Sequence, residues 1–190
     1  RWLCADLRIK PIIMEYKMKK LILGSAILAV LGVASNAMAA NSGTVNFMGA
    51  VSTATCNLSV KNNAGADIGS VDLGTLASTA TTDGVAVAFK LVPQEQTCLT
   101  KAAANMTWSS PTLSATGLNN ASTNGTNATM VLNATNATET DKFIKQGNTS
   151  FNYNVANGIK SFDFAAQLKR PAAGAMTAGP FSASASYIVA

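Results

Sequence analysis

Short runs in which apolar and polar residues alternate recur from residue 41 to the end of the chain. Alternation with period two places every second side chain on one face of a β-strand, whereas an amphipathic helix needs apolar residues three and four positions apart. Since long runs with the helical period are absent after residue 40, we predict an all-β fold, an antiparallel sandwich of half-buried strands. The apolar positions of the clearest runs are Val85, Val87, Phe89 and Leu91; Phe151, Tyr153 and Val155; Phe162, Phe164, Ala166 and Leu168; and Phe181, Ala183, Ala185, Tyr187 and Val189.

One alternating run stands apart because it comes first, in "NSGTVNFMGAV" from Asn41 to Val51. As a strand, it would direct Gly43, Val45, Phe47, Gly49 and Val51 to one face. Periodicity alone leaves two interpretations open. The run is either the first strand of a self-complete domain or a strand that serves another chain.

A further stretch, between Leu113 and Thr140, is rich in Asn, Thr, Ala and Gly. It is interrupted by the apolar "TMVLNA", which we interpret as one more strand. The remainder of this stretch we predict to be exposed loop.

Residues 18–39 have the pattern of a secretory signal peptide. Lys19 and Lys20 form a basic start, an apolar run follows, and Ala37 and Ala39 form an A-x-A cleavage pattern. The apolar run is shorter than the ~20 residues that a membrane span needs. We therefore predict an exported protein, with residues 1–17 as an upstream extension outside the natural product.

The formal charge of +5 belongs mostly to this leader. Six of the fourteen Lys and Arg residues and two of the nine acidic residues precede residue 40, so the rest of the chain is almost neutral. The remaining cations are scattered and form no basic stripe, which gives no indication of nucleic-acid binding.

The cysteine and histidine counts restrict the chemistry further. Once Cys4 leaves with the leader, Cys56 and Cys98 remain as one pair, which in an exported chain indicates a disulfide; two buried free thiols are the alternative. The sequence contains no histidine, so nucleophiles activated by histidine are excluded, and two cysteines are too few for a zinc cage. We therefore expect no enzyme activity, no metal and no cofactor.

Several segments together resemble a known family. They are "GTVNFMGAVSTATC" (43–56), "VDLGTL" (71–76), "VAFKLVPQEQTCL" (87–99), "SFDFAAQLKRP" (161–171) and the alternating C-terminal run behind Gly179. In this order they are similar to the major pilins of chaperone-usher fimbriae of type 1 character, above all those of enterotoxigenic enteric bacteria. The resemblance covers the chain from residue 40 onward.

The resemblance implies an incomplete immunoglobulin-like β-sandwich, the pilin fold, completed by a donor strand from a neighbouring subunit. Residues 40–50 would be the donor extension, with Gly43, Val45, Phe47 and Gly49 facing inward, and residues 51–190 the pilin domain. The implied partners are identical subunits in a head-to-tail polymer, a periplasmic chaperone and an outer-membrane usher. The implied location is an extracellular fimbria that mediates adhesion.

The resemblance also implies a role for the C-terminal strand. Gly179, Phe181, Ala183, Ala185, Tyr187 and Val189 would belong to the strand that the chaperone contacts. Members of the family usually carry an aromatic residue at the penultimate position, so we expect the natural chain to continue by about two residues beyond Ala190.

An alternative function is a fimbrial adhesin with its own glycan-binding site. Lys142 and Lys145 lie close to the expected exposed loop, where they could contact an acidic host glycan. Two solvated surface lysines are the simpler interpretation.

Overall fold

The computed structural model describes residues 40–51 and 56–190. The signal peptide and the upstream extension, predicted at 18–39 and 1–17, lie outside the described residues. In the part that is described, no helix has the length and apolarity needed to cross a membrane.

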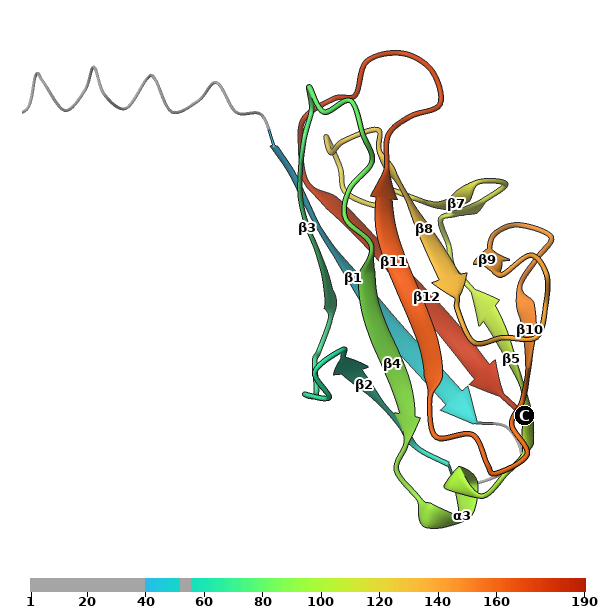
Figure 1. Ribbon diagram of the computed structural model, residues 1–190. Helices are drawn as coiled ribbons and strands as arrows, with labels where there is room; N and C mark the ends of the chain where they lie inside the picture. The colour runs from blue at the N-terminus through green and yellow to red at the C-terminus, as the bar shows by residue number, and fades with distance from the viewer. Residues whose placement is uncertain (1–39, 52–55) are drawn as a thin grey trace, which may run out of the picture. The chain divides into compact units, whose positions relative to one another are not determined.

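Two β-sheets pack face to face as a sandwich, which confirms the predicted all-β fold (Figure 1). The first sheet has the strand order β10-β5-β12-β1-β3. Its pairs are antiparallel except that β1 and β12 run in the same direction. The strands of this sheet are β1 (Ala40–Val51), β3 (Val71–Ala77), β5 (Ala103–Ser109), β10 (Ser150–Asn154) and β12 (Phe181–Val189).

The second sheet has the order β2-β4-β11-β8-β7-β6, with β9 paired to β8. A short helix, α3 (Gln96–Leu99), follows β4. The strands of the second sheet are β2 (Leu58–Asn62), β4 (Val87–Pro93), β6 (Leu113–Ser114), β7 (Gly117–Asn119), β8 (Thr129–Ala134), β9 (Phe143–Ile144) and β11 (Phe162–Lys169).

Aromatic side chains connect the two sheets in the core. Trp108 of β5 meets Phe164 of β11 edge-on, with ring centroids 5.2 Å apart, and Phe164 stacks on Phe89 of β4 at 5.4 Å. All three side chains are buried. Such stacked and edge-on pairs stabilise a core beyond the contribution of the apolar area that they bury.

The predicted strands at 162–168, 181–189 and "TMVLNA" are confirmed as β11, β12 and β8, but two expected strand ends are wrong. Val85 is 81% exposed and precedes β4, and Val155 is 41% exposed just after β10. Near Val85 the chain is held instead by a loop contact, because the Gly84 amide donates to the Leu168 carbonyl at 2.9 Å. Alternation in the sequence therefore extended past the point where pairing stops.

The prediction of exposed loop around "TMVLNA" is also wrong. This stretch contains β6 and β7, and Leu118, Ala128 and Ala137 are buried. Burial is possible because asparagine side chains satisfy backbone groups that strand pairing leaves free. Asn136, for example, donates to the Ser161 carbonyl at 3.0 Å and accepts from the Asp163 amide at 2.8 Å.

Candidate functional site

Strand β1 occupies a slot between β12 and β3. It pairs in parallel with β12 from Gly43 opposite Phe181 to Val51 opposite Val189, and antiparallel with β3. Among the described strands, β3 is hydrogen-bonded into a sheet through β1 alone. Without β1, the first sheet would be divided by a gap one strand wide, with two unpaired edges.

The face of β1 predicted to point inward does so at each position whose side chain is described. Val45 is fully buried, and Phe47 is half-buried, whereas Asn46 between them is exposed. Phe47 stacks on Phe89 with ring centroids 4.7 Å apart and meets the edge of Trp108 at 5.7 Å. The inward side chains of β1 therefore complete the aromatic core.

Gly43 lies where little space remains for a side chain. A Cβ atom added there would stand 3.1 Å from the Cβ of Phe181 and 3.3 Å from the Cδ1 of Leu73, which is closer than ordinary van der Waals contact. A larger residue would therefore have to displace Phe181 or Leu73, the side chains that flank the slot.

The far edge of β12 is bonded independently of β1. Its last residues pair with β5. Farther upstream, the Ser184 carbonyl accepts from the Ser110 hydroxyl at 2.7 Å, and the Ser182 carbonyl accepts from the Ala121 amide at 2.8 Å. These contacts hold one wall of the slot in place whichever strand occupies it.

The residues predicted to contact a chaperone form that wall, with one exception. Phe181, Ala183, Ala185, Tyr187 and Val189 are buried on one face of β12. Gly179 instead lies in the turn before β12, where its φ of 141° and the Asn124 carbonyl oxygen, 3.0 Å from where a Cβ would be, favour glycine. The structure thus places the predicted donor strand and the predicted chaperone-contacting strand side by side.

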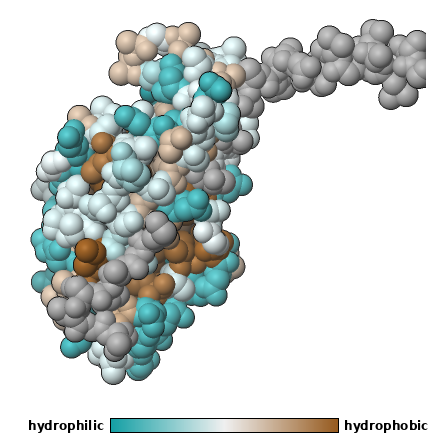
Figure 2. Space-filling model, turned by 180° about the vertical axis from the view of Figure 1, so that it is seen from behind, coloured by the Kyte–Doolittle hydropathy of each residue, from teal (hydrophilic) through white to brown (hydrophobic). Residues whose placement is uncertain are grey.

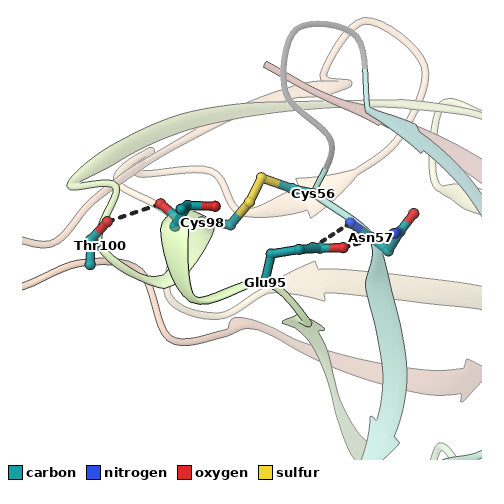
Figure 3. The surroundings of a disulfide bond; sticks show 6 residues. Cys56, Asn57, Glu95, Cys98 and Thr100 are labelled. Carbon is teal, nitrogen blue, oxygen red and sulfur yellow. Dashed lines mark hydrogen bonds between the residues drawn. A yellow bond between two sulfur atoms is a disulfide. The ribbon is translucent and has the colours of Figure 1, made fainter.

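The disulfide predicted between Cys56 and Cys98 is present, with Cα atoms 5.9 Å apart (Figure 3). It joins Cys56, just before β2, to Cys98 in α3. The Glu95 carboxylate accepts from both the backbone amide and the side-chain amide of Asn57, each at 2.8 Å. This clamp and the disulfide together fix the start of β2 against α3.

A cavity of about 290 Å³ lies beside the disulfide. Its lining is mainly apolar and includes Val189, the last residue of β12. The other main lining residues are Leu58, Pro93, Ile159 and Phe162, with Lys101 as the cation.

Lys142 and Lys145 are close together around β9, but both already have intramolecular partners. The Lys145 ammonium pairs with the Asp141 carboxylate at 2.8 Å, and Lys142 donates to the Thr135 carbonyl at 3.1 Å. The hydrogen bond from Lys145 lowers the pKa of Asp141, helped by the backbone amide of Phe143. Phe143, between the two lysines, is 44% exposed.

Two tyrosines of the first sheet have side chains whose pKa is changed by burial. Burial raises the pKa of Tyr153, with smaller effects from Glu139 and Asp163, and burial alone raises the pKa of Tyr187. The Tyr153 hydroxyl is buried without a hydrogen-bond partner among the described residues. In residues 40–51 and 56–190, no group of three or more cysteine and acidic side chains is placed to hold a metal ion.

Figure 2 shows the side opposite to that of Figure 1. Apolar colour appears there in isolated groups and in one broader group in the lower half of the view.

Comparisons with known proteins agree with this geometry. The chain is 35% identical over 183 residues to the K99 fimbrial protein of Escherichia coli, an alignment that covers 90% of this chain and 98% of that protein. This chain belongs to the fimbrial protein family. A second relative, the F107 fimbrial protein of Escherichia coli, is 29% identical over 175 residues with the same coverage of both chains. No protein-family model matches the chain.

The resemblance stated from the sequence is therefore confirmed, and the protein is a fimbrial subunit. Its relatives imply a place in an appendage at the cell surface. Sequence reasoning missed two side chains of this fimbrial subunit that lie against β1, Leu73 of β3 and Trp108 of β5. Alternation could have predicted Trp108 as an inward-facing strand residue, because Met106 and Trp108 alternate with polar residues in "ANMTWS".

Proposed function

We propose that this subunit polymerises by donor-strand exchange, in which β1 leaves its own slot and fills the slot of the next subunit. The observation that carries the proposal is that, within the part of the chain that the structure describes, β3 is bonded into its sheet through β1 alone. A strand from another chain supplies the same main-chain hydrogen bonds to both edges, and its alternate side chains fill the same pockets.

An unfilled slot explains why assembly would need helpers. Two unpaired strand edges and an open apolar groove are templates for aggregation. We propose that the leader at 18–39 directs export to the periplasm, where a chaperone fills the slot until an outer-membrane usher exchanges it for β1 of the incoming subunit. The product is a head-to-tail surface fimbria that mediates adhesion.

A deletion of residues 40–48, co-expressed with the chaperone and usher of its gene cluster, tests the proposal. The deleted subunit should still be exported, form the Cys56–Cys98 disulfide and be isolated as a complex with the chaperone. It should fail to add to a neighbour. Loss of this complex, together with a stable monomeric full-length protein that forms no fibres, would show that β1 serves only its own domain.

A matched pair of substitutions separates assembly from folding. Phe47→Glu places a charge on the inward face of β1, and Asn46→Glu places the same charge on the outward face. We expect the first variant to bind the chaperone but to form no fibres visible by electron microscopy, because a buried unpaired charge is strongly unfavourable. The second variant should form fibres normally.

A second proposed function is glycan binding by the assembled subunit through Lys142 and Lys145. The exposed ring of Phe143 between these cations supports it, since aromatic faces and cations together suit acidic sugars. The ion pair of Lys145 with Asp141 counts against it. Fibres carrying Lys142→Ala and Lys145→Ala should lose signal on a glycan array if these residues bind sugar.

A further inference from the structure

The cavity beside the disulfide has a buried floor and an exposed rim. On the floor, Ile159, Phe162 of the second sheet and Val189 of the first sheet are buried. On the rim, Lys101 and Ala103 are exposed to solvent. A recess of this shape admits a small molecule from solvent without any change in the fold.

The walls of the cavity offer little to which water could bond. Among the described residues that line it, Lys101 alone has a charged or hydrogen-bonding side chain. Apolar cavities stay free of water and take up apolar molecules, and one of about 150 Å³ holds a benzene molecule. The present volume of about 290 Å³ therefore suits an alkyl chain of about ten carbons.

The backbone that carries Lys101 is firmly held. Its amide donates to the Cys98 carbonyl at 3.1 Å, and its carbonyl accepts from the Ile159 amide at 2.8 Å. Gly158 packs so closely on this turn that a Cβ atom added there would collide with the Leu99 carbonyl oxygen. The lysine therefore starts from a fixed point at the rim, while its long side chain remains exposed.

The positive charge at this rim has no ion-pair partner. Within the described chain, no ion pair joins the Lys101 ammonium to a carboxylate. Lys160 donates to the Leu99 carbonyl at 3.0 Å and so adds a second cation close to the same rim. Glu95, the acidic residue nearest to Lys101 in the sequence, accepts hydrogen bonds from Asn57 on both carboxylate oxygens. A negatively charged group at the rim would be attracted by both lysines.

We propose that this cavity binds a medium-chain carboxylate of about ten carbons, because its apolar floor and cationic rim match the two parts of such a molecule. The alkyl tail lies against Ile159, Phe162 and Val189, and the carboxylate pairs with Lys101 at the rim. The two acyl chains of a membrane lipid would need several times the volume of the cavity, so the ligand is a free carboxylate. The proposal does not depend on strand exchange.

A series of chain lengths tests the fit of the tail. The exported, oxidised subunit is titrated calorimetrically with sodium hexanoate, octanoate, decanoate and dodecanoate, each below the concentration at which it forms micelles. We expect one saturable site whose affinity rises about fourfold per added methylene and levels off near ten carbons, when the cavity is full. Absence of saturable decanoate binding, or a rise that continues unchanged to dodecanoate, would overturn the proposal.

Decanol, which lacks the charge, tests the role of Lys101. The Lys101→Ala variant should bind decanoate about twofold to fivefold more weakly, the ordinary effect of an exposed ion pair, and should bind decanol as the parent does. Lys90→Ala is the matched control, since Lys90 is not among the residues that line the cavity. An equal loss for both ligands, or for both variants, would contradict the position assigned to the carboxylate.

A variant that fills the cavity tests the site itself. Ala104 of β5 lines the cavity and is half-buried, so Ala104→Leu should abolish the binding of decanoate and of decanol. Unchanged binding by a folded, oxidised Ala104→Leu subunit would overturn the site. Lys101→Ala, which changes only an exposed side chain, keeps the test decisive if the filled variant does not fold.

Vesicles of phosphatidylglycerol distinguish a free carboxylate from a membrane surface. The subunit should not sediment with these vesicles, although it binds decanoate. Sedimentation that Lys101→Ala abolishes would show that the rim recognises lipid, which would overturn the assignment to a free carboxylate.

Discussion

Phe47 of β1 stacks on Phe89 of β4, with ring centroids 4.7 Å apart and ring planes inclined by 24°. The contact joins β1 to the opposite sheet of the sandwich. Because Phe47 also meets Trp108, the fluorescence of Trp108 reports whether β1 is in its slot. Trp108 is the one tryptophan that remains once the residues before 40 are removed.

Phe47→Ala should lower the free energy of unfolding of the monomer by about 3 kcal/mol, near the lower end for a phenylalanine truncation, because Phe47 is only half-buried. Urea unfolding followed by Trp108 fluorescence measures the change. Asn46→Ala, on the exposed face of the same strand, should change the free energy of unfolding by less than about 0.5 kcal/mol. Equal effects of the two substitutions would contradict the burial of this face.

Gly43→Ala should destabilise the monomer by about 1 to 3 kcal/mol, because the added methyl group presses on Phe181 and Leu73. Gly69→Ala is the matched control, since a Cβ atom at Gly69 has no neighbour within 4 Å. The control should be neutral or slightly stabilising, because alanine reduces the freedom of the unfolded chain. Thermal unfolding of both variants under the same conditions gives the comparison.

Replacing both Cys56 and Cys98 by alanine should lower the free energy of unfolding by about 4 kcal/mol, the chain-entropy value for the loop that the disulfide closes. The separation of 42 residues between the cysteines sets this value. Denaturant unfolding of the oxidised parent and the double variant measures the difference. Mass spectrometry showing free thiols in the exported parent protein would contradict the disulfide itself.

Lowering the pH should remove the contribution of the ion pair between Asp83 and Lys169 to the free energy of unfolding. The Lys169 Nζ and Asp83 Oδ2 atoms of this pair are 2.7 Å apart. The hydrogen bond from Lys169 and the amide of Arg170 lower the pKa of Asp83. A carboxylate whose pKa is lower in the folded state contributes stability above its unfolded value, about 3.9, and loses it as the pH falls through the folded value.

Stability measured from pH 7 down to pH 2 checks this expectation. The Asp83→Asn variant should be less stable than the parent at neutral pH and should converge with it below about pH 4. Lys169→Met, which removes the partner, should behave in the same way. A constant difference between parent and variants across this range would show that Asp83 acts through packing and not through its charge.

Much of the sandwich could be predicted from local pattern. The strands β11 and β12 were predicted almost to their ends, because period-two alternation reflects one buried and one exposed face whatever the strand pairs with. The disulfide was also predictable, because Cys56 and Cys98 are the two cysteines that follow residue 40. The strands β2, β3 and β5 and the short strands β6, β7 and β9 were missed. Strand β2 is half-buried at every position, so its residues carry no contrast between faces.

The stretch from 113 to 140 shows what local pattern cannot supply. Its asparagines are typical of loops. In the structure, however, the Asn120 side-chain amide donates a hydrogen bond to the Pro180 carbonyl, and the Asn127 side-chain oxygen accepts one from the Thr177 backbone amide. These partners are about fifty to sixty residues away, as their numbering shows. Such polar contacts allow the segment to be buried, and no periodicity in the sequence predicts them.

The sequence by itself determined that residues 41–51 form a strand with one apolar face, since that follows from alternation alone. Only the tertiary structure decided where this face lies: in a slot whose walls, β12 and β3, are separated by more than a hundred residues of chain. It also showed that β1 pairs with β12 in parallel. The physical reason is that alternation specifies which side chains share a face, whereas partner, direction and register depend on the shapes of residues brought together from distant parts of the chain.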